Sequence, residues 1–199
     1  MTELGVADEL LMRRVQEGDR DAFLDLVRRH QHGVYGYLWK MCRDVHEAED
    51  VAQEAFLSVW RARGTWDARF AFRPWLFRIA RNALNQARRS RSRPEPRAAE
   101  AASPPSAALE REELLGALRW CVDALPREQK EVLVLRQNEG LTLEEIAAVL
   151  RIPVGTVKTR YSAGLEGLRR LLRTRFHGDF DDLFRCPGGP VDQLRARRD

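Results

Sequence analysis

Residues 48–60 constrain the fold most strongly, because their apolar side chains recur at intervals of three and four. The run starts at Ala48, ends at Trp60 and has Val51, Ala52, Ala55, Phe56 and Val59 between them. A repeat of about 3.6 residues places apolar side chains along one face of an α-helix. We find no stretch that alternates apolar and polar residues with a period of two. The chain is therefore predicted to be all-α.

The segment 91–108, RSRPEPRAAEAASPPSAA, separates two helical parts of the chain. It has four prolines and many alanines and serines, but no large apolar side chain. Such a segment buries too little surface to offset the entropy lost on ordering, so we expect a flexible linker. We predict one small helical domain at 5–90, a second at 109–175 and a C-terminal extension at 176–199.

Three further helices are predicted within 5–90. Leu10, Leu11 and Val15 share one side of the first, which ends at Gly18, since glycine commonly follows a helix C-terminus. The second begins near Asp21, and the fourth begins after Pro74. The inward side of the fourth carries Trp75, Leu76, Ile79, Ala80, Ala83 and Leu84.

The C-terminal part contains a predicted helix-turn-helix. Thr142 and Glu145 have the spacing of a capping box, and the helix that they start reaches about Leu150. A short turn leads to a last helix at about 154–173, which leaves Thr156, Lys158, Thr159, Arg160 and Ser162 on the outside. Residues 151–175 include seven lysines or arginines and one acid. This pattern favours binding in the DNA major groove over an ordinary helical hairpin with a solvated basic face.

An arginine-rich stretch lies between Asp67 and Glu95, with eight arginines and no acid. Arginine neutralises phosphate, exposed aromatic rings can stack on bases, and Asn or Gln can read base edges. The aromatic residues of this stretch are Phe70, Phe72, Trp75 and Phe77, and its amides are Asn82, Asn85 and Gln86. The other interpretation is that the aromatic rings are core. We favour core for Trp75 and leave both interpretations open for Phe70.

The helix at 48–60 is acidic. Asp44, Glu47, Glu49, Asp50 and Glu54 lie in a stretch without lysine or arginine. The helix dipole accounts for acids in the first turn, but not for Asp50, Gln53 and Glu54 further along. Because such a surface repels DNA, it indicates a protein partner.

Taken in order, these motifs resemble the extracytoplasmic-function group of the sigma-70 family. AEDVAQEAFLSVW at 48–60 is similar to its polymerase-binding segment, and FRPWLFRIARNALNQARR at 72–89 to its minus-ten segment. Residues 125–160 resemble its minus-thirty-five domain, and 18–30 the opening of the family pattern. The resemblance implies a sigma factor that binds core RNA polymerase, recognises both promoter elements and promotes transcription initiation. It also implies control by an anti-sigma factor.

The resemblance assigns roles to individual residues. The polymerase-docking positions are Asp50, Gln53, Glu54, Phe56 and Trp60. The minus-ten positions are Asn82, Asn85, Arg88 and Arg89, together with Asp67, Arg69 and Phe70 in a loop at 64–73 that captures an unpaired base. The minus-thirty-five positions are Thr156, Lys158, Thr159 and Arg160.

The chain departs from the family pattern in its C-terminal part. Arg151 stands where the family usually has glycine, and a left-handed turn there would cost roughly 1–2 kcal/mol. Ala163 and Gly164 replace a common Arg-Ala pair, and Gly167 adds a second weak helix position. We therefore expect a looser end of the recognition helix and a weaker C-terminal DNA contact.

Composition excludes several other classes of protein. Cys42, Cys121 and Cys186 lack metal-site spacing, so we expect reduced thiols, no metal and no cofactor. The N-terminus is acidic and no apolar run is long enough for a membrane span, so we expect a cytoplasmic protein without membrane insertion. In the extension, Phe176, Phe180, Leu183 and Phe184 leave docking on the body, contact with a regulator and disorder all open.

Two rival functions follow from the same residues. A helix-turn-helix transcription factor that acts without polymerase would bind duplex DNA well by itself, but it has no need for the acidic helix. A nucleic-acid-modifying enzyme would need a catalytic constellation, and His30 and His32 lie on different sides of a helix without a nucleophile beside them. We therefore expect no enzymatic activity.

Overall fold

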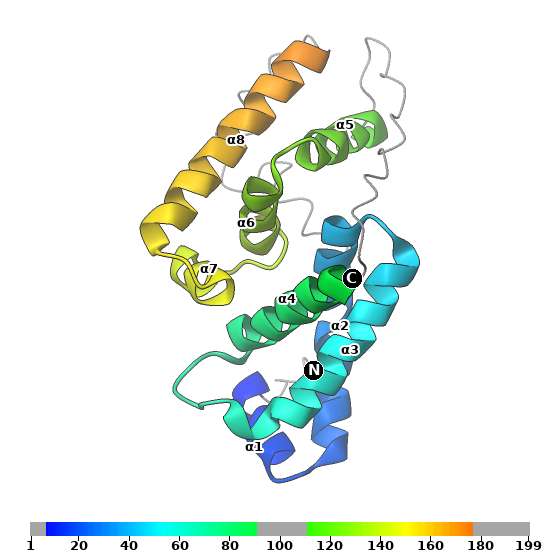
Figure 1. Cartoon of the computed structure of the whole chain (residues 1–199), viewed down its shortest axis with the longest axis vertical. Coiled ribbons are helices and arrows are strands. Elements are labelled where there is room, and N and C mark those ends of the chain that lie inside the picture. The colour runs from blue at the N-terminus through cyan, green and yellow to red at the C-terminus, as the bar shows by residue number, and fades with distance from the viewer. Residues whose placement is uncertain (1–6, 91–110, 177–199) are drawn as a thin grey trace, which may run out of the picture. The chain divides into compact units, whose positions relative to one another are not determined.

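The computed structural model describes residues 7–90 and 111–176, which contain eight α-helices and one short 3-10 helix (Figure 1). These two ranges contain no β-strand, which confirms the all-α prediction. The chain divides into two compact units, of which the first contains α1–α4 and the second contains α5, α6 and α8. The predicted linker at 91–108 and residues 177–199 of the predicted extension lie outside the described residues.

The first unit is a bundle of four helices in which neighbours along the chain pack together. α2 packs against α1 and α3, and α3 packs against α4. Tyr37 of α2 and Phe77 of α4 are fully buried and meet edge to face, with ring centroids 5.7 Å apart. The helices are α1 (Asp8–Gln16), α2 (Arg20–Cys42), α3 (Val45–Ala62) and α4 (Phe72–Ser90), with the 3-10 helix η1 (Arg63–Thr65) after α3.

The connection between α1 and α2 follows from two residues. Gly18 has a φ of +94°, and the N–H groups of Gly18 and Asp19 donate to the carbonyls of Val15 and Arg14. This is the Schellman arrangement, in which a left-handed residue turns the chain back on the helix end. The Asp19 side chain then accepts hydrogen bonds from two N–H groups of the next helix, so α2 starts one residue before the predicted Asp21.

The prediction that Leu10 shares one side of α1 with Leu11 and Val15 is wrong. Leu10 is 51% exposed, whereas Leu11, Met12 and Val15 are buried. The buried side of this helix is centred on residues 11, 12 and 15, and residue 10 lies about 145° around the helix from that centre. Leu10 therefore makes no contribution to the core.

The start of α4 also differs from the prediction. The helix begins at Phe72, not after Pro74, because proline fits the first helical turn, where no intrahelical partner exists for the missing N–H. The irregular segment between η1 and α4 is therefore residues 66–71, which we call the 66–71 loop. Its neighbours in the chain include a buried aromatic residue, Phe72.

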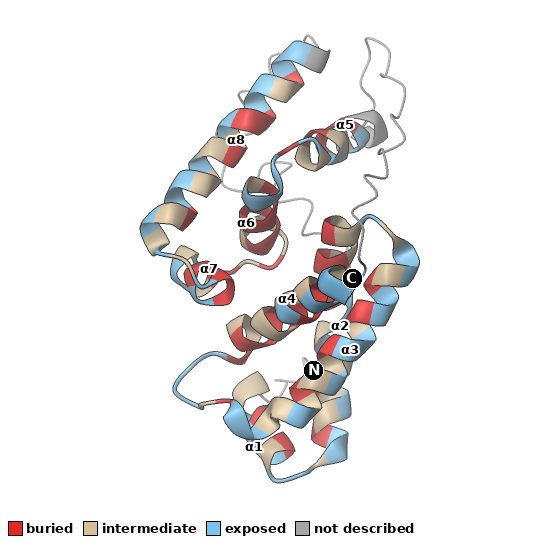
Figure 2. Cartoon of the chain, viewed as in Figure 1, coloured by how far each residue is buried: buried red, intermediate tan, exposed pale blue. Residues whose placement is uncertain are grey.

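The second unit is built on α8 (Val154–Phe176), which packs against α5 (Arg111–Asp123) and α6 (Arg127–Gln137). Six consecutive residues of α6, at 130–135, are buried, so this helix is covered on more than one side (Figure 2). The buried Lys130 ammonium is neutralised by the Asp123 carboxylate at 2.8 Å.

The predicted helix-turn-helix is confirmed in its local geometry. Thr142 and Glu145 form the capping box at the start of α7 (Leu143–Leu150), with side-chain to backbone bonds of 3.1 and 2.7 Å. Arg151 adopts the left-handed conformation with φ +56°. This conformation is the one expected at a position where the family usually has glycine. α8 then begins at Val154 and ends three residues beyond the predicted 173.

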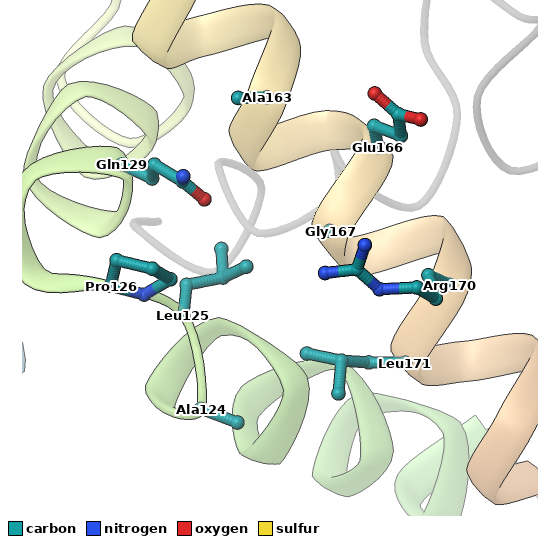
Figure 3. Close-up of a pocket in the computed structure, with 9 residues that line it drawn as sticks. All are labelled: Ala124, Leu125, Pro126, Gln129, Ala163, Glu166, Gly167, Arg170 and Leu171. Atoms are coloured by element: carbon teal, nitrogen blue, oxygen red, sulfur yellow. The ribbon is translucent and has the colours of Figure 1, made fainter.

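Two of the three glycines of α8, Gly164 and Gly167, are buried against neighbouring side chains, which gives them a role that the sequence did not reveal. A Cβ on Gly164 would lie 2.9 Å from Cδ1 of Leu133, and one on Gly167 would lie 2.7 Å from Cδ2 of Leu125. Gly167 and Leu125 also line a hollow of about 290 Å³ (Figure 3). Glycine at these positions allows close packing of α8, so low helix propensity is only part of its effect.

Candidate protein-binding and nucleic-acid interfaces

The outward side of α3 carries most of the predicted polymerase-docking residues. Asp50, Gln53 and Glu54 are exposed, and helical spacing places all three on the same side as Leu57. Leu57 is 50% exposed and is not among the docking residues predicted from the sequence. The sequence pattern could have predicted this exposed leucine, because it lies seven residues after Asp50 and outside the apolar stripe of the helix. We define Asp50, Gln53, Glu54 and Leu57 as the α3 outer face.

The charge of the α3 outer face is partly balanced from within the helix. The Glu54 carboxylate accepts hydrogen bonds from Arg61 at 2.8 Å and from Ser58 at 3.2 Å. The Arg61–Glu54 pair is well exposed, so it contributes little to stability and can exchange for another partner. Asp50 lies one turn earlier and is exposed.

Trp60 lies at the edge of this face and has a mixed environment. Its ring packs against Phe23 of α2 at 5.1 Å between centroids, and the guanidinium of Arg63 lies 4.5 Å over it. Trp60 and Phe56 are both half-buried. Trp60 is thus partly core and partly surface, and the cation–π contact with Arg63 fixes one side of its ring.

The 66–71 loop presents an exposed aromatic ring on a tight turn. The N–H of Phe70 donates to the carbonyl of Asp67, and Arg69 binds the Asp67 carboxylate with contacts of 2.6 and 2.9 Å. The Arg69 hydrogen bond holds the pKa of Asp67 below its usual value. Phe70 is 65% exposed, with the Arg69 guanidinium 5.9 Å from its ring.

Burial separates the aromatic residues that the sequence grouped together. Phe72, Trp75 and Phe77 are buried. This confirms the prediction that Trp75 belongs to the core. Phe70 is exposed, so the alternative that it belongs to the core is wrong. Among these four rings, only that of Phe70 is available to a ligand.

α4 displays a polar face, but not every predicted minus-ten residue belongs to it. Asn82 and Arg89 are exposed, and helical spacing places Asn85 and Gln86 beside them. Arg88 instead points to the end of α2, where its guanidinium donates to the Met41 carbonyl at 2.5 Å. A cation at a helix C-terminus is favourable, so this arginine joins two helices of the unit.

The start of α8 brings together the predicted minus-thirty-five residues. Lys158 and Thr159 are exposed, and Thr156 is half-exposed. Arg160 forms an ion pair with Glu128 of α6, and the exposed fraction of its side chain is 25%. Glu128 is itself mostly exposed, so the pair is weak enough for a DNA phosphate to replace it.

Within 7–90 and 111–176, no group of three or more His, Cys, Asp or Glu residues is placed to hold a metal ion. In the same ranges no helix has the length and apolar character needed to cross a membrane. Burial raises the pKa of the Cys121 thiol to about 11. This thiol is thus a core side chain without reactivity at neutral pH.

Comparison with known families gives two matches in the order of the two units. Residues 26–94 match Sigma-70 region 2, and residues 115–168 match Sigma-70, region 4. The first range contains the α3 outer face and the 66–71 loop, and the second contains the helix-turn-helix. A solved structure of CnrH in complex with the cytosolic domain of CnrY is similar, with a TM-score of 0.66 and 26% identity. The similarity covers 85% of this chain and 99% of CnrH.

Two curated relatives extend over most of the chain. The RNA polymerase sigma-H factor of Pseudomonas aeruginosa is 35% identical, with coverage of 83% of this chain and 94% of that protein. The ECF RNA polymerase sigma factor SigW of Bacillus subtilis is also 35% identical, with coverage of 81% and 95%. This level of identity over nearly full length, with both sigma regions in order, shows that the chain belongs to the extracytoplasmic-function sigma factors of the sigma-70 family and serves promoter recognition and transcription initiation with core RNA polymerase.

Proposed function

We propose that the α3 outer face, with Phe56 and Trp60 at its edge, is the surface by which this sigma factor docks on core RNA polymerase. The single observation that carries this proposal is the exposed Leu57 among Asp50, Gln53 and Glu54. An exposed leucine in an acidic surface suits a protein interface with an apolar centre and a polar rim. A DNA-binding surface would instead carry arginine or lysine.

The 66–71 loop and the polar face of α4 are proposed to bind the opened minus-ten strand. The Phe70 ring can stack on an unpaired base, a contact worth about 1–3 kcal/mol. Arg69 and Asp67 neutralise each other in the free protein, so Arg69 can turn to a phosphate and Asp67 to a donor group on a base edge without leaving a buried charge. Asn82, Asn85 and Arg89 then follow the strand along α4. Arg88 supports the unit through Met41 in the free protein, and it remains a candidate for a phosphate contact.

The start of α8 is proposed to read the minus-thirty-five element in the major groove. The N-terminal residues of a recognition helix face the base edges. Thr156, Lys158 and Thr159 occupy these positions, and Arg160 can leave Glu128 for a phosphate. An exposed ion pair contributes about 0–1 kcal/mol, whereas a charge-assisted phosphate bond contributes about 1.5–3 kcal/mol.

An anti-sigma factor is the proposed regulator, and we place its contact on the α3 outer face. The similar protein CnrH is found in a complex with the cytosolic domain of CnrY. A partner that covers Leu57 and Asp50 would block polymerase docking directly. The proposed location of the protein is the cytoplasm, where core polymerase is found, and its role is that of a binding subunit without an enzymatic reaction.

The docking proposal is tested by co-elution of the full chain with purified core RNA polymerase. Asp50→Arg combined with Leu57→Arg changes two exposed side chains and should abolish co-elution while the helical circular dichroism stays unchanged. Leu10→Arg is the matched control, because Leu10 is an equally exposed leucine of the same unit. Trp60→Ala should also weaken co-elution, but it removes the Phe23 contact and needs its own stability measurement.

The results of the co-elution experiment show whether the α3 outer face is the docking surface. Loss of co-elution in the double variant, with binding retained by Leu10→Arg, supports the α3 outer face. Unchanged co-elution of the double variant would contradict it. Failure of the wild-type chain to co-elute at low salt under reducing conditions would remove the basis of the polymerase-docking proposal.

A further inference from the structure

Helix α1 makes hydrogen bonds to both ends of the 66–71 loop. At the beginning, the Gln16 side-chain amide donates to the carbonyls of Arg63 and Trp66, at 3.1 and 2.9 Å. At the end, the Glu9 carboxylate accepts the N–H of Phe72 at 3.2 Å. Glu9 and Gln16 are seven residues apart, which is two turns of helix, so both side chains lie on the same face about 10 Å apart.

The residues that α1 holds are also the buried limits of the loop. Trp66 is 3% exposed and Phe72 is 1% exposed, whereas residues 68–71 between them are all exposed. The exposed part therefore projects from two fixed points whose backbone groups are bonded to one helix. A short segment with both ends fixed has few accessible conformations, and this lowers the entropy lost when it binds a ligand.

α1 is itself firmly attached to the rest of the unit. Leu11, Met12 and Val15 bury one side of it. At its N-terminus, Asp8 binds His30 of α2 at 2.7 Å and Arg29 at 3.1 Å. The His30 ring also contacts the Phe72 ring, with centroids 5.4 Å apart. These contacts give Glu9 a fixed position from which to hold the start of α4.

We infer that Glu9 and Gln16 are positioning residues for minus-ten strand binding, acting through the backbone of the 66–71 loop. They touch no DNA themselves. Their effect is to hold Trp66 and Phe72 so that the turn from Asp67 to Phe70 presents its ring in the binding orientation. This inference rests on the proposed function of the loop, and it adds α1 to the machinery of that function.

The test uses the full chain assembled with core RNA polymerase. A promoter is first recovered from a random-sequence DNA library by transcription with the wild-type holoenzyme. Binding is then measured to a fluorescent duplex of that promoter whose minus-ten region is left unpaired. Gln16→Ala and Gln16→Glu should each lower affinity for this probe about fivefold or more, since each loses two hydrogen bonds. Gln16→Glu keeps the length of the side chain, so it separates the amide donor from simple packing.

Glu9 provides a rescue experiment at the other end. Glu9→Ala should lower affinity for the unpaired probe by a few fold, because the Phe72 N–H loses its acceptor. Glu9→Gln keeps an acceptor oxygen and should restore most of the affinity. Glu17→Gln is the control, because Glu17 is an exposed residue at the end of the same helix. Co-elution with core polymerase should be unchanged in all of these variants.

Two measurements keep the inference separate from the proposed function of the loop. Hydrogen exchange of residues 66–72 should be faster in Gln16→Ala and Glu9→Ala than in the wild type, with exchange of α3 unchanged. If Phe70→Ala lowers probe affinity but the α1 variants do not, the positioning role is refuted and the loop proposal stands. If Phe70→Ala and Arg69→Ala have no effect, the loop proposal itself fails.

Discussion

Gly164 and Gly167 of α8 allow a paired prediction, because alanine at the two positions meets different surroundings. Alanine in a helix interior is favoured over glycine by about 1 kcal/mol, so substitution should stabilise the helix if space permits. At Gly164 the new Cβ would lie 2.9 Å from Cδ1 and 3.2 Å from Cγ of Leu133, which is 3% exposed. Overpacking of this kind costs about 1–3 kcal/mol. Gly164→Ala should therefore destabilise the second unit by about 1 kcal/mol.

At Gly167 the closest atom is one terminal methyl group, Cδ2 of Leu125, at 2.7 Å. Leu125 lines the hollow of about 290 Å³ beside Gly167, so its side chain can turn into free space (Figure 3). The rotation costs about 0.5–1.5 kcal/mol if the new angle is off a rotamer, and less if it is not. The helix propensity gain then roughly cancels the cost, and Gly167→Ala should be neutral to slightly stabilising.

The assay is calorimetric unfolding of the full chain, with circular dichroism to follow loss of helix. A change of 1 kcal/mol in a domain of 60–100 residues shifts the melting temperature by about 4–8 °C. Gly164→Ala should lower the transition of the second unit by this amount, and Gly167→Ala should move it by less than half as much. Equal destabilisation of both variants would refute the role of the hollow. A more stable Gly164→Ala would refute the close packing of Leu133.

The structure supports three further predictions. Arg151→Gly should stabilise the helix-turn-helix by about 0.5–1 kcal/mol, measured by urea unfolding, because glycine adopts φ +56° with less strain. A loss of stability would contradict this. Cys121 should not react with a thiol reagent at pH 8 until the chain unfolds, because burial raises its pKa to about 11. Cys121→Ser is the control that shows which part of the labelling comes from Cys121. Rapid labelling of Cys121 in the native chain would contradict its burial. Burial raises the pKa of Asp8, but His30 and Arg29 outweigh this effect and lower the pKa below its usual value. The Asp8 carboxylate therefore stabilises the fold above pH about 4 and loses that effect as the pH falls further. Asp8→Asn should make the stability less dependent on pH in that acid range, and an unchanged pH profile would contradict the interaction.

The helices were predictable because their causes are local. The apolar stripe at 48–60, the glycine after α1 and the Thr142–Glu145 capping box each act within one helix or one turn, and the structure confirms all three. The predictions were wrong where neighbouring residues, or neighbouring positions for a helix start, had the same sequence features. Leu10 has the same character as Leu11, and only packing against α2 decides which of them is buried. Pro74 marks a helix start, but a proline fits any position in the first turn.

The interaction surfaces were predictable in part. Phe70 could not be assigned from sequence, because an aromatic residue before a helix is as suitable for the core as for a ligand, and burial settled it. Leu57 had a readable position on the helix and was overlooked. Gln16 had no signal at all, since its partners are backbone carbonyls 47 and 50 residues away in the chain. Long-range bonds between a polar side chain and backbone leave no pattern in the amino-acid sequence.

Arg151 shows how strain and function combine in this chain. The residue holds a left-handed turn at the end of α7, where the Ile152 N–H donates to the Ala147 carbonyl, and the family usually has glycine there. A cation near the C-terminus of α7 recovers about 0.3–1 kcal/mol, which is less than the roughly 1–2 kcal/mol cost of the conformation. In the free protein arginine is therefore the weaker choice. Arg151 is exposed three residues before the recognition helix, and a phosphate contact there, contributing about 1.5–3 kcal/mol, would reverse that balance. We therefore predict that Arg151 favours the DNA-bound state, so that Arg151→Gly should weaken binding of duplex DNA by the holoenzyme, and an unchanged affinity would contradict a phosphate contact at this position.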